Sequence, residues 1–465
     1  MLFSSITFLY YFLPLVLILY FIAPKKLKNV VLLIASLMFY AWGEPKCVFL
    51  MLLTIVWNYC FGILIEKAQK KNTKKIYLTV SIIGTLSGLL YFKYAGFFVE
   101  NFVRIFGIST PALNIVLPIG ISFYTFQILS YSVDVYRGEV AAQKNPITLA
   151  TYIALFPQLI AGPIVRYKDV AEQLDNRTHS FDKAAEGIKR FVCGLSKKII
   201  LANTLGELCE GFYNSNDLSV AYFWLFAVSY TLQIYFDFSG YSDMAIGLGK
   251  IFGFEFLENF RYPFISKSIT EFWRRWHISL GSWFRDYVYF PMGGSRVGKG
   301  RLVFNLLTVW LLTGFWHGAE WNFILWGLFF FVFLTIEKFF FKGFLEKSKV
   351  ISHIYTLFLV AVSFVIFSGN GLQEAIIRVG GLFGAGNIPL VSEGVAFAIK
   401  NYGTVILVAA VCSTPLLKIL YDKLRMTKAS PIIEVLEIPV LLMLVIITTA
   451  YLADGSFNPF LYFRF

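Results

Sequence analysis

The sequence is short of charge, of histidine and of paired cysteine, and each shortage argues against a class of protein. Only 15% of the 465 residues are charged, whereas a soluble domain carries about 25%. The five cysteines are scattered, with no CxxC pair and no metal-ligand spacing, so they indicate neither a disulfide framework nor a zinc module. With four histidines in the chain, we expect no bound metal, because a zinc site gathers several ligands.

Long apolar runs, in contrast, are abundant. Hydrophobic residues make up 57% of the chain, and the mean hydropathy is +0.67. An apolar run of about 20 residues crosses the hydrocarbon layer as a helix, and such runs recur along the whole sequence. The first of them, near Met1, lacks the basic leader and cleavage site of a signal peptide, and none alternates as membrane β-strands do. The sequence therefore predicts an all-α, polytopic membrane protein with a single domain over residues 1–465.

The net charge is +13, and the positions of the basic residues along the chain show what kind of protein it indicates. Lysines and arginines gather between the apolar runs, which is typical of the cytoplasmic loops of membrane proteins, and this argues against nucleic acid as a partner. One such cytoplasmic loop is predicted over residues 166–190, and a glycine-rich outer loop over residues 369–394. The alternation of inner and outer loops predicts about 11 transmembrane helices.

The middle of the chain, residues 232–318, departs from this pattern because charged side chains interrupt its apolar runs. Residues 269–294, ITEFWRRWHISLGSWFRDYVYFPMGG, are amphipathic and carry charges too often for a lipid-facing span. We expect an interfacial helix here, or a re-entrant one that enters the membrane and returns. Asp237 and Asp243 are expected either to pair with buried arginines or to line a passage, since unpaired carboxylates are costly at membrane depth.

A histidine stands inside one of the most apolar stretches, LLTGFWHGAEWNFILWG, residues 311–327. Basic residues flank this tract on both sides, so we expect a helical hairpin that turns at Gly318 and places His317 near its far end. An ionisable group at that depth is by default a candidate for function, and a neutral imidazole can take a proton from a hydroxyl. The alternative is a structural histidine packed between Trp316 and Trp321.

The other three histidines differ in their surroundings. His277 lies within the amphipathic RRWHISLGSW and is the second candidate. His179 lies in the polar DNRTHS, where we expect it to be solvated, and His353 follows a lysine cluster and is expected at the interface. The HxxE pattern formed by His317 and Glu320 is too short to indicate a metal site.

Several stretches resemble the signature sequences of the membrane-bound O-acyltransferase family. LTGFWHGAEWNFILWG is similar to the family's histidine signature, and RYPFISKSITEFWRRWHISLGSWFRDYVYFPMGG resembles the second signature of its bacterial polysaccharide branch. YFDFSGYSDMAIGLGKIFGF, LPIGISFYTFQILSYSVDVYRG and FPQLIAGPIVRY are similar to the same branch, and FYAWGEPK resembles its alginate O-acetyltransferase subgroup. The resemblance covers a signature core over about residues 40–320, while the C-terminal helices over residues 321–465 show only hydropathy.

The resemblance implies many helices around a central tunnel, with His317 and His277 as the catalytic residues. It implies an acyltransferase that moves an acyl group, here acetyl, from a cytoplasmic thioester donor across the bacterial cytoplasmic (inner) membrane for O-acetylation of an extracytoplasmic polysaccharide, as in alginate biosynthesis. The expected donor is acetyl-CoA or an acyl carrier thioester, with no cofactor bound. The expected partners are membrane lipid, the polysaccharide and an extracytoplasmic acetyltransferase of the SGNH or esterase-like kind.

In this interpretation His317 is the base or a transient acyl carrier. Five further residues are candidates for donor binding: Arg274, Arg275, Arg285, Trp316 and Asn322. Arginine binds phosphate through paired hydrogen bonds, which suits coenzyme A or a phosphopantetheine arm. The three arginines are equally explained by binding to lipid headgroups and by the positive-inside bias.

Two other interpretations remain open at this point. A related branch of the family transfers D-alanine to teichoic acid from a carrier protein. A non-enzymatic transporter subunit of a polysaccharide export machine would also have buried charges and glycine-broken helices, but transporters typically carry inverted repeats, and the sequence has no internal repeat. A transporter or scaffold would tolerate the loss of His317, whereas an acyltransferase would not.

Overall fold

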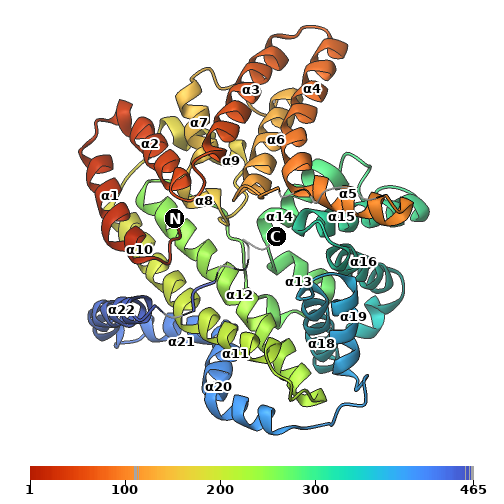
Figure 1. Ribbon diagram of the computed structural model, residues 1–465. Helices are drawn as coiled ribbons and strands as arrows, with labels where there is room; N and C mark the ends of the chain where they lie inside the picture. The colour runs from red at the N-terminus through yellow and green to blue at the C-terminus, as the bar shows by residue number, and fades with distance from the viewer. Residues whose placement is uncertain (109–112, 114, 456, 460, 462–465) are drawn as a thin grey trace. The chain divides into compact units, whose positions relative to one another are not determined.

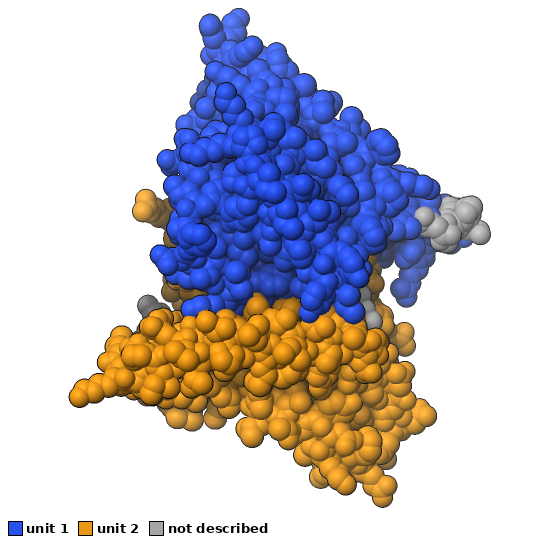
Figure 2. Space-filling model, turned by 90° about the vertical axis from the view of Figure 1, so that its left-hand side faces the viewer, with its two compact units in different colours: residues 1–191, 244–257 blue, residues 192–243, 258–465 orange. Residues whose placement is uncertain are grey.

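The computed structural model describes residues 1–108, 113, 115–455, 457–459 and 461, and over these residues it is helical and contains no strand. The all-α prediction is therefore confirmed. The chain divides into two compact units, residues 1–191 with 244–257 and residues 192–243 with 258–465 (Figure 2). The single domain over residues 1–465 stays a prediction.

The first unit opens with an apolar helix, η1 (Thr7–Phe12) continued by α1 (Leu13–Ile22). Its other helices are η2 (Lys25–Leu27), α2 (Lys28–Ala41), α3 (Cys47–Lys67), α4 (Lys71–Leu89), η3 (Leu90–Tyr94), α5 (Ala95–Phe106), α6 (Ile121–Arg137), α7 (Pro146–Ala154), α8 (Phe156–Leu159), α9 (Tyr167–Asp175) and α10 (Phe181–Ser196) up to residue 191 (Figure 1). A buried polar cluster joins three of them, because Asn58 of α3 hydrogen-bonds to Ser81 and Thr85 of α4 and to Ser132 of α6. In a membrane the hydrophobic effect does not favour contact between helices over contact with lipid, so polar contacts of this kind help to hold apolar helices together.

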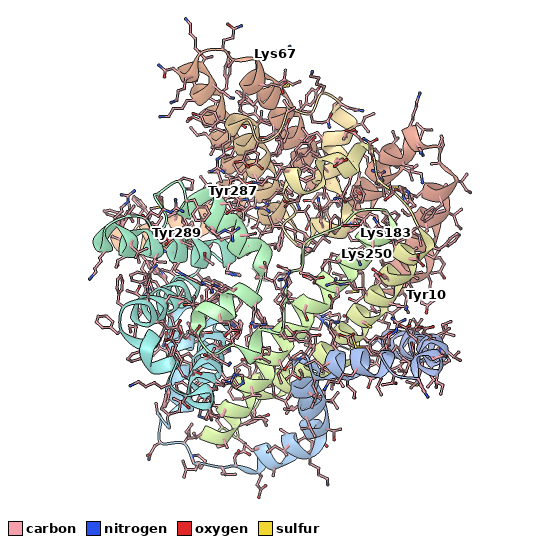
Figure 3. The ribbon with its side chains drawn as sticks, turned by 180° about the vertical axis from the view of Figure 1, so that it is seen from behind. Tyr10, Lys67, Lys183, Lys250, Tyr287 and Tyr289 are labelled. Carbon is pink, nitrogen blue, oxygen red and sulfur yellow. The ribbon has the colours of Figure 1, made fainter. Side chains whose placement is uncertain are left out.

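The predicted cytoplasmic loop over residues 166–190 is mostly helical, because α9 and α10 occupy most of it, and its cytoplasmic placement stays a prediction. Both helices are amphipathic: α9 buries Val170 and Leu174, and its charged residues lie on the other face. The high charge content hid this helical periodicity. Ion pairs stabilise the charged side, with Lys183 bound to Glu255 at 2.8 Å and Lys250 bound to Glu186 at 2.5 Å (both lysines are labelled in Figure 3).

The second unit holds the longest helix, α12 (Val220–Ile251), which continues into the first unit from residue 244. Its other helices are η4 (Lys197–Ala202), α11 (Asn203–Tyr213), η5 (Pro263–Ile265), α13 (Ile269–Arg275), α14 (Ile278–Phe284), η6 (Arg285–Tyr289), α15 (Lys299–His317), α16 (Trp321–Ile336), η7 (Glu337–Phe341), α17 (Lys342–Leu345), α18 (Lys349–Phe367), α19 (Leu372–Leu382), α20 (Glu393–Cys412), α21 (Leu416–Arg425) and α22 (Ser430–Ala453). The predicted outer loop over residues 369–394 contains α19, which buries Ala375 and Leu382. That prediction is corrected accordingly.

The amphipathic segment over residues 269–294 is not one helix. It is broken into α13, α14 and η6, and Trp276 and His277 stand at the first break. The seven-residue helices α13 and α14 are each about 10 Å long, so neither crosses a membrane by itself.

The predicted hairpin around Gly318 is confirmed. Helix α15 ends at His317, α16 begins at Trp321, and the two pack closely along their length (Figure 1). Glycines allow this approach, because a Cβ on Gly314 would lie 2.4 Å from the Phe323 carbonyl oxygen, and one on Gly327 would lie 2.4 Å from that of Trp310. The small residues let the two backbones meet, as is common between membrane helices.

We expect Gly314→Ala to lower the free energy of unfolding by about 1–3 kcal/mol, because the added methyl group forces two backbones apart. Gly300→Ala is the matched control in the same helix, since a Cβ there meets no atom within 4 Å. Thermal unfolding of the two purified variants in detergent would measure the difference. Equal midpoints for the two would contradict the close packing.

Among the residues that the structure describes, six helices are long and apolar enough to cross a membrane: Cys47–Lys67, Lys71–Phe106, Trp321–Phe341, Lys349–Phe367, Glu393–Cys412 and Ser430–Ala453. The first apolar helix, Thr7–Ile22, is shorter. The polytopic membrane character is thus supported by the described helices, while the count of about 11 crossings is not confirmed.

Candidate active site

His317 is the last residue of α15, and only 5% of its surface is exposed. Its ring packs against three aromatic rings of the second unit, with centroids 5.0 Å from Trp316, 4.9 Å from Trp326 and 5.4 Å from Phe367. All three pairs meet edge to face, so the imidazole sits in an apolar, aromatic wall. The neutral form of an imidazole is the one that can take up a proton.

A small cavity adjoins this ring. Its volume is about 10 Å³, and it is lined by Ile234, Asp237, Trp276, His317, Trp326, Phe364, Phe367 and Leu461. That volume is about the least that holds one water molecule. An acyl group does not fit in a cavity of this size, and the central tunnel implied by the resemblance stays a prediction.

The cavity wall includes an ion pair that the sequence did not reveal. The Lys198 ammonium lies 2.5 Å from Oδ1 of Asp237, and both side chains are almost fully buried, with 3% and 2% exposed. The predicted arginine partner of Asp237 is wrong, because Lys198 takes its place, and Asp243 pairs with Lys197 at 2.6 Å. The available signal was the Lys-Lys doublet within the apolar CGLSKKIILA. A π-helical turn, η4, carries both lysines.

The same ion pair anchors the end of the described chain. Lys198 donates a hydrogen bond to the carbonyl oxygen of Pro459, and the backbone N–H of Leu461 donates to Oδ2 of Asp237 at 3.0 Å. The side chain of Leu461 thereby becomes part of the cavity beside His317. Asp237 is thus paired, although with a lysine in place of the expected arginine, and it also borders the small cavity beside His317.

The structure brings the second candidate, His277, close to the first. Its ring centroid lies 6.0 Å from that of Trp316, the residue that also packs on His317. His277 is 1% exposed and stands outside the six candidate spans. Burial lowers its pKa to about 3, so its imidazole is neutral at physiological pH. His317, Trp316 and His277 therefore form one cluster.

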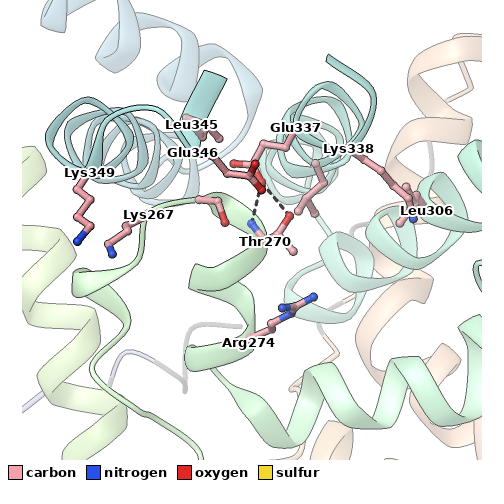
Figure 4. A pocket seen from close by; sticks show the side chains of 11 residues that line it. Lys267, Thr270, Arg274, Leu306, Glu337, Lys338, Leu345, Glu346 and Lys349 are labelled. Carbon is pink, nitrogen blue, oxygen red and sulfur yellow. Dashed lines mark hydrogen bonds between the residues drawn. The ribbon is translucent and has the colours of Figure 1, made fainter. Parts of the chain in front are cut away.

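Arg274 lies elsewhere in the second unit, at a pocket of about 810 Å³ (Figure 4). Basic side chains outnumber acidic ones around this pocket, with Lys267, Arg274, Lys338 and Lys349 facing Glu337 and Glu346. Glu337 is already engaged, because it accepts hydrogen bonds from the backbone N–H groups of Ile269 and Thr270 at 2.6 and 3.0 Å. The described residues include no carboxylate within ion-pair distance of Arg274, so its guanidinium can bind an anion.

The remaining predicted donor-binding residues lie apart from that pocket. Arg275 pairs with Glu271 at 2.8 Å and donates to the Arg261 carbonyl oxygen. Arg285, with 56% of its side chain exposed, pairs with Asp286 at 2.8 Å. Asn322 is buried and donates to the carbonyl oxygen of Gly369 at 2.7 Å, which ties the start of α16 to the chain after α18. Of the three arginines, only Arg274 lines the large pocket.

Comparison with known proteins identifies the class to which this helical fold and buried histidine site belong. Residues 8–373 match the family model of MBOAT, the membrane-bound O-acyltransferase family, and the chain belongs to this family. It is 40% identical over 486 residues to a probable alginate O-acetylase AlgI of Pseudomonas putida, with 100% of each chain covered. It is 33% identical over 427 residues to a peptidoglycan O-acetyltransferase of Helicobacter pylori, covering 84% of this chain and 81% of the other. A teichoic acid D-alanyltransferase of Bacillus subtilis is 30% identical over 284 residues, covering 56% and 71%.

These comparisons confirm the resemblance found in the signature stretches. The chain is a multi-pass membrane protein and an acyltransferase. The catalytic and donor-binding roles of individual residues stay predictions. The structure adds Lys198, Asp237 and Leu461 to the surroundings of His317.

Proposed function

We propose that the protein transfers an acetyl group from acetyl-CoA, bound on the cytoplasmic side, for O-acetylation of an extracytoplasmic polysaccharide at the bacterial cytoplasmic membrane. The observation that carries the proposal is the buried His317 in the histidine signature, with a second buried imidazole, His277, near the same Trp316 ring. The full-length similarity to a probable alginate O-acetylase supports acetyl as the acyl group and a polysaccharide as the final acceptor.

The chemistry proposed for His317 is general base catalysis. The imidazole takes the proton of the accepting hydroxyl, whose oxygen attacks the thioester carbonyl carbon. The C–S bond then breaks, the sulfur leaves as a thiolate, and the imidazolium returns the proton to it, so that free thiol and acetyl ester are the products. The accepting hydroxyl belongs to the polysaccharide or to an SGNH or esterase-like partner that passes the acetyl group on.

The donor is proposed to place its phosphates at the basic pocket of Arg274. A volume of about 810 Å³ lies within the range of about 300–1,000 Å³ typical of ligand sites. Helix α13 connects this pocket with the histidine cluster, since Arg274 lines the pocket and Trp276, two residues on, lines the cavity beside His317. The lysine-rich rim fits the cytoplasmic side under the positive-inside rule.

We expect Arg274→Gln to raise KM for acetyl-CoA about tenfold or more with kcat little changed, because a charge-assisted hydrogen bond of about 1.5–3 kcal/mol is lost. Arg285→Gln is the matched control, because Arg285 is paired with Asp286 and does not line the pocket. Steady-state acetyl transfer with purified variants measures both constants. An unchanged KM for Arg274→Gln would contradict the proposal that the phosphates of the donor bind in this pocket.

The experiment that tests the function compares two donors. Membranes with the protein receive either labelled acetyl-CoA or a carrier protein loaded with labelled D-alanine. We expect label to be transferred only from acetyl-CoA, and to appear in an ester. Transfer from the D-alanyl carrier protein would instead favour the teichoic acid activity. That alternative has weaker support, since the D-alanyltransferase of Bacillus subtilis aligns with 56% of this chain.

A further inference from the structure

Asn259 connects the loop before α13 to the second histidine. Its side chain is fully buried, and its Oδ1 accepts hydrogen bonds from the backbone N–H of Ser279 at 3.2 Å and from the Ser279 hydroxyl at 2.9 Å. Its Nδ2 donates to the hydroxyl of Ser242 at 3.1 Å. A backbone N–H can only donate, so the Ser279 amide settles which end of the Asn259 side chain is oxygen.

This orientation determines the tautomer of His277. Nδ1 of His277 lies 3.1 Å from the same Oδ1 of Asn259. Because an amide oxygen only accepts, Nδ1 must carry the hydrogen, and a neutral imidazole has only one N–H. Nε2 therefore carries a lone pair, and among the described residues it has no hydrogen-bond partner although it is buried.

The backbone at His277 is held by the same segment. His277 has a left-handed conformation, with φ of 46° and ψ of 52°, which is costly for a residue with a side chain and is commonly maintained at functional sites. The N–H of Ile278 donates to the carbonyl oxygen of Asn259 at 3.0 Å. Nearby, the N–H of Arg261 donates to the carbonyl oxygen of Arg275 at 2.9 Å. Asn259 thus fixes the main chain and the ring of His277 together.

We propose that Asn259 is a positioning residue that locks His277 as the Nδ1–H tautomer, so that Nε2 acts as a hydrogen-bond acceptor for an O–H or N–H group of the substrates. The proposal rests on the proposed acyl transfer for its functional part. Stabilising the developing oxyanion of the thioester requires donors, and a lone pair at Nε2 is the opposite of a donor. His277 thus holds a substrate and does not stabilise the oxyanion.

The tautomer can be observed directly by solid-state NMR of protein labelled with ¹⁵N-histidine in lipid vesicles. The chain has four histidines, and the spectrum of His277→Phe identifies the signals of His277. We expect a protonated Nδ1 and a non-protonated Nε2 in the unmodified protein. A protonated Nε2 would overturn the proposal.

Variants of Asn259 test its part in the lock. Asn259→Leu has a similar shape but no acceptor, so we expect the Nδ1–H signature to be lost and kcat to fall by about 10–100-fold, as when a partner orienting a functional histidine is removed. Asn259→Asp keeps an acceptor and should retain the signature and restore much of kcat. Ser242→Ala, which removes only the contact to Nδ2, should leave the signature unchanged.

The outcomes separate this proposal from the proposed function. If His277 in Asn259→Leu still shows a protonated Nδ1 and a non-protonated Nε2, Asn259 does not fix the tautomer, even if the protein transfers acetyl groups. A protein that shows the expected tautomer but transfers no acetyl group would refute the function and leave the lock standing. Circular dichroism and yield in detergent establish that each variant is folded.

Discussion

Replacing His317 with alanine should lower acetyl transfer by at least about a hundredfold, and by up to about ten-thousandfold, the range expected for loss of a general base. The reason is that the substitution removes the imidazole, the proposed proton acceptor, from its place among Trp316, Trp326 and Phe367. The measurement is the ester content of the extracytoplasmic polysaccharide in cells, normalised to the amount of protein in the membrane.

His353→Ala provides the control for this prediction. His353 is half-buried, and its Nδ1 forms a hydrogen bond with the carbonyl oxygen of Ser266 at 3.1 Å. It does not line the cavity beside His317. We expect close to normal acetylation in that variant. Full acetylation by His317→Ala at normal protein level would mean that the ring is structural, and that the catalytic group lies elsewhere.

The second large effect concerns stability. Lys198→Met should lower the free energy of unfolding by about 3–5 kcal/mol, because it leaves the carboxylate of Asp237 buried without its counter-charge. Lys197→Met is the matched control from the same helical turn. Its pair with Asp243 is more exposed, at 30% and 17%, so the carboxylate left behind is less deeply buried and we expect a smaller loss than for Lys198→Met. Unfolding in detergent of increasing denaturing strength measures both.

A double variant separates charge from shape. Lys198→Met with Asp237→Asn removes both charges and keeps an oxygen that can accept the N–H of Leu461. We expect it to recover at least half of the stability lost by Lys198→Met, since neither residue is then an isolated buried ion. If the double variant is as unstable as the single one, packing and not charge is what Lys198 contributes.

The parts of the fold that were predictable are those written in local sequence. The α15–α16 hairpin followed from an apolar run interrupted by glycine, and the structure places the turn where it was expected. The helices α9, α10 and α19 were missed, because charge or glycine in these segments resembles a loop when periodicity is not weighed. The break in the amphipathic segment at Trp276 and His277 depends on a left-handed backbone at His277. No local sequence pattern predicts that conformation at a histidine.

The site was predictable only in part, for a similar reason. His317 and His277 are far apart in the sequence, and only the family resemblance placed them together. Arg274, Arg275 and Arg285 looked equivalent in one aromatic segment, yet their environments differ. Arg274 and Arg275 are neighbours in α13, but Arg274 lines the pocket and Arg275 pairs with Glu271, while Arg285 lies beyond the helix break and pairs with Asp286. The partner expected for Asp237 was an arginine, whereas the structure gives Lys198, because hydropathy does not encode contacts between distant helices.

The most direct test uses inverted membrane vesicles, whose cytoplasmic face is outermost, from cells that make the polysaccharide. Acetyl-CoA labelled in the acetyl group is added outside, and label is counted in material protected inside. We expect protected, ester-linked label with the unmodified protein and almost none with His317→Ala. Label that stays outside with the unmodified protein, or protected label in equal amount with His317→Ala, would contradict it.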